Sequence, residues 1–208
     1  MCSKKGNFEI HITVSERDEW KFRMWCHNKR FKPIKAVSKT GICPRQLMFS
    51  TFKYNTLEYV LEYTYQIRKE ILNQGITVLR TKVEANINNS TVPSTHPHPT
   101  NYYEFHFKPI ITTTQEWNLL DRVCTAMSGP NWDVAYSINT IKRDLIPIVT
   151  VRVYQSTRDN AITITNTVLA NFGRQGIICN DQIQREYSVY DDNQDLDKGW
   201  IIVASDLV

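Results

Sequence analysis

Polar and apolar residues alternate in two segments that open the two halves of the chain. The first is Phe8-Glu9-Ile10-His11-Ile12-Thr13-Val14 and the second is Tyr103-Glu104-Phe105-His106-Phe107-Lys108. A period of two residues is typical of a strand with one buried face. Both segments share the order aromatic, Glu, apolar, His, apolar, which suggests that they occupy equivalent places in a repeated fold.

After each of these strands come apolar residues at helical spacing and a glycine that ends a helix, in the same order in both halves. Acidic residues after Ser15 and Thr114 favour helix starts, and the Gly75 and Gly176 stops are each followed by an apolar run. The first half predicts helices over 15–29 and 56–73 and strands over 33–38, 46–53 and 76–87. The second half predicts helices over 114–127 and 159–174 and strands over 132–138, 146–154 and 177–189.

The repeated order strand, helix, strand, strand, helix, strand predicts an α+β fold, a tandem duplication of a ferredoxin-like unit with antiparallel sheets and helices on one face. We expect a first half over 1–87, a Pro/Asn/Thr-rich linker over 88–101, and a second half over 102–208 with an acidic C-terminal segment. His96 and His98 lie in the linker, where the adjacent prolines hold the backbone extended and favour a linker over a metal site.

Four segments carry a resemblance to other proteins. They are Val92-Pro93, Tyr103 to Lys108, and the C-terminal runs Val189 to Asn193 and Leu196 to Trp200. Together they loosely resemble an uncharacterised group of tandem-duplicated proteins. The resemblance implies the repeat and brings no activity with it.

Composition indicates an ordinary soluble protein. The chain has 208 residues, of which 22% are charged and 41% apolar, and no apolar run approaches the roughly 20 residues of a spanning helix. The polar N-terminus lacks the apolar region of a secretory signal, so we expect a cytoplasmic location and no membrane partner. The five cysteines are scattered without a C-x-x-C pair, which favours free thiols, and Cys124 and Cys179 have the apolar neighbours of buried ones.

Charge is unevenly distributed between the halves. Residues 1–100 carry 16 Lys+Arg against 8 Asp+Glu, and residues 101–208 carry 9 against 13. Basic residues interleaved with aromatics between Lys21 and Tyr54 are compatible with an RNA segment or a small anionic ligand, with Lys29, Arg30 and Lys32 as candidate binding residues. The alternatives are a solvated basic face over an aromatic core, or pairing of the oppositely charged halves, within the chain or in a homo-oligomer.

The two Glu-x-His pairs mark the polar sheet face as the best functional clue. Alternation places Glu9, His11 and Thr13 on one face of the first strand, and Glu104, His106 and Lys108 on the matching face of the other. Helices cover the apolar face, so the polar face is where the halves meet or a ligand lies. One interpretation is purely structural pairing of Glu with His. Another is a site for a divalent metal such as Zn, Mn or Fe with ligands Glu9, His11, Glu104 and His106, close to Glu84 or Glu186 on the closing strands.

A third interpretation is enzymatic. His11-Ile12-Thr13-Val14 resembles the His, hydrophobic, Thr, hydrophobic element of the 2H phosphoesterase family, and His106-Phe107-Lys108-Pro109 is a second histidine element with Lys in place of Ser or Thr. The resemblance implies one histidine as base and the other as acid in opening a cyclic or RNA phosphodiester. Its candidate catalytic residues are His11, Thr13, His106 and Lys108.

Other familiar sites are absent from the sequence. It has no Gly-rich phosphate loop, no G-x-S-x-G and no H-E-x-x-H. The acidic run from Asp191 to Asp197 lacks the glycine and closing glutamate of a calcium loop, which favours a solvated turn. The leading hypothesis is therefore a ligand-binding or interaction protein that uses its polar sheet faces, with the phosphoesterase and metal-binding functions as alternatives.

Overall fold

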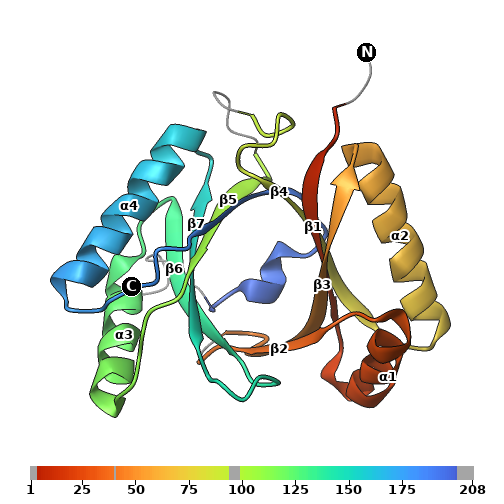
Figure 1. Cartoon of the computed structure of the whole chain (residues 1–208), viewed down its shortest axis with the longest axis horizontal. Coiled ribbons are helices and arrows are strands. Elements are labelled where there is room, and N and C mark those ends of the chain that lie inside the picture. The colour runs from red at the N-terminus through yellow and green to blue at the C-terminus, as the bar shows by residue number, and fades with distance from the viewer. Residues whose placement is uncertain (1–3, 40, 94–98, 201–208) are drawn as a thin grey trace.

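The strands of both halves close into one antiparallel barrel. The computed structural model describes residues 4–39, 41–93 and 99–200, and within these ranges eight strands are hydrogen-bonded in the order β1-β3-β2-β6-β7-β5-β8-β4 (Figure 1). The α-helices lie outside the ring of strands (Figure 1). The mixed α+β class expected from the sequence is confirmed.

The strands and α-helices follow one another in the same order in each half. The first half contains β1 (Gly6–Val14), the short 3-10 helix η1 (Glu16–Asp18), α1 (Glu19–Lys29), β2 (Pro33–Val37), β3 (Arg45–Asn55), α2 (Leu57–Asn73) and β4 (Val78–Asn86). The second contains β5 (Tyr102–Phe107), α3 (Thr114–Met127), β6 (Trp132–Asn139), β7 (Pro147–Tyr154), α4 (Arg158–Arg174), β8 (Gln184–Asp191) and the 3-10 helix η2 (Gln194–Asp197).

Side-chain caps set the starts of the longer helices. Thr56 and Thr157 accept hydrogen bonds from backbone N–H groups in the first turns of α2 and α4. Thr113 forms a capping box with Glu116 at the start of α3. Such caps satisfy N–H groups that have no partner within the helix, which is why these starts were readable from the sequence.

Two strand pairs join the halves. Within each half the strands lie in the order β4-β1-β3-β2 or β8-β5-β7-β6. β2 then pairs briefly with β6 at Ala36 and Val37, whereas β4 and β8 pair over a longer stretch. The antiparallel sheets predicted for the two halves are thus parts of a single closed sheet, and the face turned away from the helices becomes the barrel interior.

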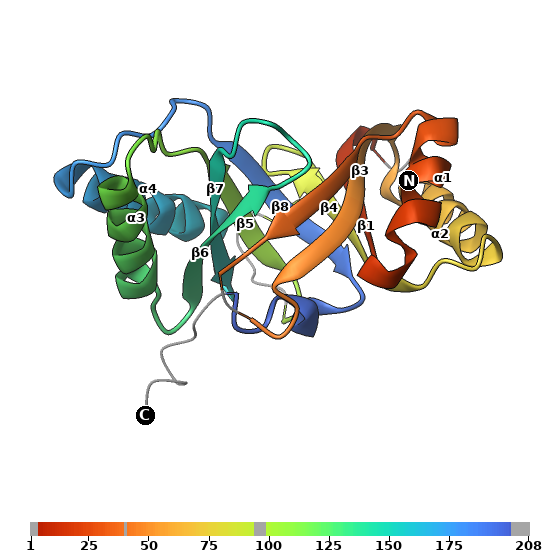
Figure 2. The ribbon, with the colours of Figure 1, turned by 90° about the horizontal axis from the view of Figure 1, so that it is seen from below.

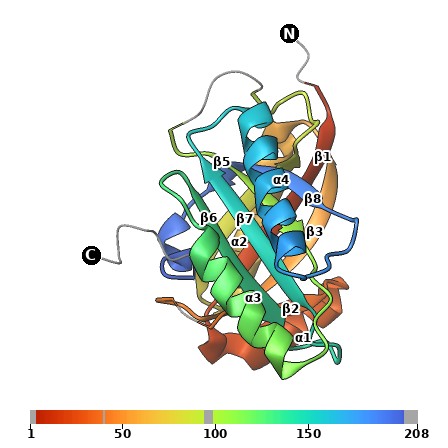
Figure 3. The same ribbon diagram turned by 90° about the vertical axis from the view of Figure 1, so that its left-hand side faces the viewer.

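The apolar core lies between the sheet and the helices on both sides of the barrel. Phe8, Ile10 and Ile12 are fully buried on the helix-facing side of β1, as are Phe105 and Phe107 on β5. Figure 2 shows α1 and α2 on the outer side of one half and α3 and α4 on that of the other, and Figure 3 shows α3 and α4 in front of β6 and β7. The helix-facing alternation predicted for β1 and β5 is confirmed.

The aromatics of the basic segment divide between core and surface. Phe22, Trp25 and Phe49 are buried, and the half-buried Phe31 stacks on Phe49 with ring centroids 4.6 Å apart. The core interpretation therefore holds for these four. Three others, Trp20, Phe52 and Tyr54, are exposed.

The last strand begins later than expected. A strand was predicted from residue 177, but β8 begins at Gln184, and 177–183 form a loop attached to the end of β5 by the Pro109–Cys179 bridge. Asn180 donates its backbone N–H to the Lys108 carbonyl at 2.9 Å. The run Asn180-Asp181-Gln182 favours a loop because its side chains compete for backbone hydrogen bonds.

The segment predicted as a linker is partly packed. Val92 belongs to the core and Asn89 is buried, with its amide donating to the Asn7 carbonyl at 3.3 Å. His96 and His98 lie outside the described residues. The domain boundaries stay a prediction.

No helix in the described part of the chain is long and apolar enough to cross a membrane.

Candidate functional site

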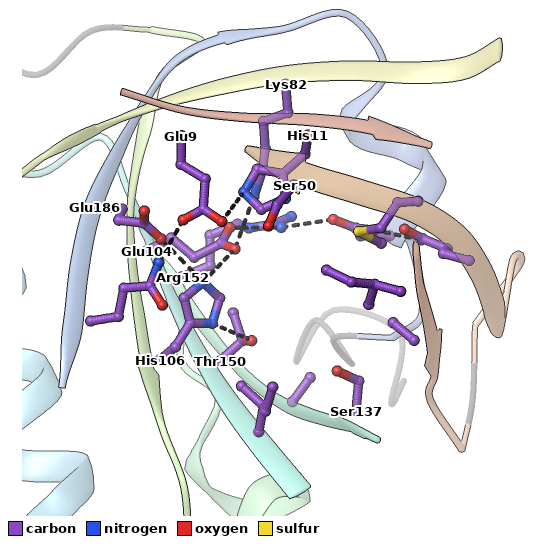
Figure 4. A pocket seen from close by; sticks show the side chains of 18 of the residues that line it. Glu9, His11, Ser50, Lys82, Glu104, His106, Ser137, Thr150, Arg152 and Glu186 are labelled. Carbon is purple, nitrogen blue, oxygen red and sulfur yellow. Dashed lines mark hydrogen bonds and ion pairs between the residues drawn. The ribbon is translucent and has the colours of Figure 1, made fainter. Parts of the chain in front are cut away.

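A cavity of about 560 Å³, lined by charged, polar and apolar side chains, lies inside the barrel. Most of its walls are the inward-pointing residues of the strands, because alternate side chains of a strand point to opposite faces. Figure 4 shows the charged and hydroxyl side chains of several strands pointing toward one another across this space. Cavities of roughly 300–1,000 Å³ are usual for small-molecule sites.

The strand registers place equivalent residues around the cavity in both halves. Glu9 of β1 lies opposite Glu84 of β4, and Glu104 of β5 lies opposite Glu186 of β8. On the other neighbouring strand, His11 faces Ser50 and His106 faces Thr150. Each half thus contributes one histidine, two glutamates and one hydroxyl.

Both imidazoles sit in front of buried carboxylates. His11 Nε2 lies 3.0 Å from Glu84 Oε2 and 3.7 Å from Glu9 Oε1. His106 Nε2 lies 3.2 Å from Glu104 Oε1, and its Nδ1 is 3.0 Å from the Thr150 hydroxyl. The imidazole side chains are 19% and 21% exposed, and the four glutamates 7% or less. The histidines are therefore the most exposed members of these clusters.

Lys82 links the two histidine clusters. Its Nζ lies 3.0 Å from Glu84 Oε1 and 3.0 Å from Glu104 Oε1. Burial opposes the charge on all three groups, but attraction between opposite charges prevails. Glu104 and Glu84 raise the pKa of Lys82, and Lys82 lowers the pKa of Glu84. The pKa of Glu104 is lowered by Arg152 first and by Lys82 second. A continuous path of contacts runs from His11 through Glu84, Lys82 and Glu104 to His106.

Glu186 has the opposite electrostatic environment. Burial, together with the nearby negative charges of Glu84 and Glu9, raises the pKa of the Glu186 carboxyl. Its Oε2 makes no hydrogen bond within the described residues and lies 3.6 Å from His106 Nε2. A carboxyl group with a raised pKa keeps its proton to higher pH, and in that form it can donate a hydrogen bond.

Two arginines hold a carboxylate at another part of the cavity. Asp197, the last residue of η2, accepts hydrogen bonds from Arg80 Nη1 at 2.6 Å and Arg152 Nη2 at 2.7 Å. Burial opposes ionisation, yet the arginine charges lower the pKa of Asp197. The interpretation of 191–197 as a solvated turn is wrong for this residue, since Asp197 is buried inside the barrel.

Most of the site residues proposed from sequence come together here. Those lining the cavity are Glu9, His11, Thr13, Glu104, His106, Lys108 and Glu186. Glu84 lies behind this lining, in contact with His11 and Lys82.

The basic candidates lie elsewhere. Lys29 pairs with Glu70 of α2 at 2.6 Å, Arg30 ends α1 in a left-handed conformation with φ 60°, and Lys32 is exposed in the following loop. None of the three lines the cavity. Any role in binding RNA would belong to a separate outer surface.

The metal hypothesis gains no geometric support. In the ranges covered by the structure, no three His, Cys, Asp or Glu side chains are placed to hold a metal ion. The Lys82 ammonium already lies between Glu84 and Glu104, where a metal cation would be repelled.

Several cavity residues were missed at the sequence level. They are Gln46, Ser50, Arg80, Lys82, Thr150, Arg152, Gln184 and Asp197. Polar alternation in Arg80-Thr81-Lys82-Val83-Glu84 and in Thr150-Val151-Arg152 was a readable signal for strands with a polar face. The position of Asp197 had no such signal, because it depends on a 3-10 helix entering the barrel.

In comparisons with known proteins, the chain matches solved structures but no family model and no curated protein. Among solved structures, a variant of chlorite dismutase from Candidatus Nitrospira defluvii aligns over 94% of each chain at 11% identity and a TM-score of 0.32. The same enzyme in complex with imidazole aligns over 90% of this chain and 93% of that one, at 10% identity and a TM-score of 0.31.

Proposed function

We propose that the protein binds a small polar molecule inside the barrel, between the His11 and His106 clusters. The observation that carries this proposal is the cavity of about 560 Å³ onto which both imidazoles open, each held by buried carboxylates. Burying charged side chains is unfavourable unless they are paired. A barrel interior built from charges around an accessible space is better suited to ligand recognition than to stability alone.

The mixture of charges indicates what kind of molecule fits. Lys82, Arg80 and Arg152 are already paired with carboxylates, and hydroxyl groups line the opposite walls at Ser50 and Thr150. A ligand therefore meets hydrogen-bond donors and acceptors on several sides. This favours a compact molecule with several polar groups over a long anionic polymer.

The equivalent registers also support descent of the halves from one ferredoxin-like unit. Glu9, His11 and Ser50 have the same mutual pairing as Glu104, His106 and Thr150. We infer a tandem duplication that placed two copies of one polar sheet face against each other. The ligand site then lies between the copies.

Thermal stability of the purified full-length protein tests the binding proposal. The wild type and a His11→Ala/His106→Ala double variant are compared across a panel of nucleotides, sugars, amino acids, divalent metals and short RNAs, with the exposed His27→Ala as the matched control. We expect a panel member to raise the Tm of the wild type and His27→Ala, and not that of the double variant. Equal shifts in all three proteins, or no shift in any, would contradict the proposal.

Phosphodiester cleavage is a second candidate, favoured by one specific observation. His11, Thr13, His106 and Lys108 all line the same cavity. One imidazole would take a proton from water as its oxygen bonds to phosphorus, and the other would give a proton to the ester oxygen that leaves as its P–O bond breaks. Thr13 and Lys108 would bind the phosphate oxygens.

A nucleoside 2′,3′-cyclic phosphate tests this candidate directly. Turnover to the monophosphate should be lost by at least a hundredfold in each of His11→Ala and His106→Ala, and retained in His27→Ala. Absence of turnover in the wild type would exclude the candidate and leave the binding proposal standing.

A further inference from the structure

The C-terminal 3-10 helix places a carboxylate in a ready-made arginine site. Asp197 is buried, and both its oxygens are engaged. Oδ2 accepts from Arg80 and Arg152, and Oδ1 accepts from Gln46 Nε2 at 2.7 Å. In Figure 1, η2 lies within the ring of strands.

The strands hold both arginines in position without the help of Asp197. Arg80 Nε also donates to Asp191 Oδ1 at 2.9 Å, and Arg152 Nε donates to Glu104 Oε2 at 2.9 Å. The Tyr102 ring lies against the Arg152 guanidinium, 4.4 Å from its centroid. Each guanidinium therefore keeps one carboxylate partner and an ordered orientation if Asp197 leaves.

The vacated position would suit an anion. Arg80 Nη1 and Arg152 Nη2 converge on one carboxylate oxygen from two strands, with the Gln46 amide on the other oxygen. Convergent guanidinium and amide donors are the usual chemistry for binding carboxylate and phosphate groups. An anion there would restore the charge that Asp197 contributes.

The segment that carries Asp197 contacts the loop over 41–43. It also contacts Thr100, through the Gln194 amide at 2.6 Å, and Gln46, through the Leu196 carbonyl at 3.3 Å. Lys198 accepts from the Ile42 N–H at 2.9 Å, and the Trp200 indole donates to the Cys43 carbonyl at 2.6 Å. Gly41 has φ +111°, and a Cβ there would lie 2.4 Å from the Trp200 ring. These contacts join the segment to residues 41–43, whereas the arginines belong to β4 and β7.

We propose that Arg80, Arg152 and Gln46 form a site for a carboxylate or phosphate group, and that Asp197 occupies this site as an internal competitor. When residues 194–200 move away, the anionic group of a ligand takes the place of the Asp197 carboxylate. The site lies in the same cavity as the histidine clusters, and Arg152 also bonds to Glu104 of the His106 cluster. Binding at the arginines nevertheless does not require a ligand at the histidines.

Asp197→Ala in the full-length chain opens the site. The probes are inorganic phosphate and acetate, each added at constant ionic strength against chloride and followed by Tm and calorimetry. We expect saturable stabilisation of Asp197→Ala, with an affinity at least tenfold above that of the wild type. Asp195→Ala, an exposed aspartate of the same 3-10 helix, should behave as the wild type. The phosphate and acetate arms show which of the two groups the site prefers.

Trp200→Ala provides a second variant that keeps Asp197 and both arginines. It removes the hydrogen bond to Cys43, so the internal carboxylate should compete less well and phosphate affinity should rise. The exposed Trp20→Ala is its control.

The proposal is overturned by either of two results. One is no saturable effect of phosphate or acetate on Asp197→Ala or Trp200→Ala. The other is an equal effect on Asp195→Ala, which would reveal a general salt response. Phosphate binding by Asp197→Ala should persist when His11→Ala and His106→Ala are added, so failure of the histidine proposal is seen separately.

Discussion

Replacement of Lys82 by methionine tests the electrostatic account of the barrel interior. Lys82 Nζ lies 3.0 Å from one oxygen each of Glu84 and Glu104, and all three side chains are buried. Methionine keeps most of the volume of lysine and removes the charge. The variant therefore leaves Glu84 with His11 as its nearest basic group, and Glu104 with Arg152 and His106.

The magnitude follows from these distances. With an effective dielectric constant of about 20, each contact is worth roughly 5 kcal/mol, against a desolvation penalty of several kcal/mol that the variant no longer bears. A carboxylate can also escape by taking a proton, which costs about 3 kcal/mol at pH 7 for a group with an ordinary pKa of 4.5. We expect a loss of about 3–5 kcal/mol in the free energy of unfolding at pH 7.

The loss should depend on pH with a defined sign. In the wild type the pKa of Glu84 is lowered, so its contribution is present above the ordinary pKa and is lost as the pH falls through the lowered value. In the variant the pKa of Glu84 should rise above the ordinary value, so the free energy of unfolding of the variant falls as the pH rises. The difference between the two proteins should therefore shrink by up to about 1.4 kcal/mol per pH unit between pH 7 and pH 5.

Urea unfolding followed by tryptophan fluorescence at pH 5, 6, 7 and 8 measures this difference. Lys69→Met, at an exposed position on α2, is the control and should stay within about 0.5 kcal/mol of the wild type at every pH. A loss in Lys82→Met that is below about 1 kcal/mol, or that is independent of pH, would refute the reasoning. The contribution of Lys82 to stability would then come from packing and not from its charge.

Two further predictions concern the backbone and the thiols. Gly41→Ala should lower the free energy of unfolding by about 1–3 kcal/mol in urea titrations, because Gly41 has φ +111° and the new Cβ would clash with Trp200. Gly173→Ala is the control: Gly173 lies in α4 with nothing within 4 Å of its Cβ, so this change should raise the free energy of unfolding by about 0.4–1 kcal/mol. Equal effects of the two changes would contradict the close approach of Gly41 to Trp200. Cys26 should react with a thiol reagent at pH 8 only after unfolding, because burial raises its pKa to about 12; rapid labelling of the folded protein, followed by mass spectrometry of the Cys26 peptide, would show that the side chain is accessible.

Local pattern was enough to predict most elements and the orientation of the first strand in each half. The alternation of polar and apolar residues over 8–14 predicted that Ile10 and Ile12 face the helices and that Glu9 and His11 face away from them, because side chains of a strand alternate with a period of two. The glycine at position 75 and the capping threonines similarly act within a few residues. The pattern failed at 177–183, where a short apolar run precedes polar residues and a loop contact to Lys108 decides the conformation.

Tertiary structure alone decided what the polar faces do. The same Glu-x-His segments suit two open sheets or two sheets packed together, and the choice depends on the β2–β6 and β4–β8 pairings. Those pairings join strands far apart in the sequence, so the periodicity within each strand does not predict them. Only closure of the barrel connects His11 to His106 through the contacts of Glu84, Lys82 and Glu104.

The burial of Asp197 is the clearest case of a property set by the whole fold. In the sequence it belongs to an acidic run that favours solvent, because isolated carboxylates are strongly hydrated. In the barrel, Arg80 and Arg152 converge on it from two strands and offset the loss of water. The sequence by itself determined which residues are polar and which face of each strand they share. The closed sheet determined which of them meet, because a charge can be buried only where distant strands supply its partners.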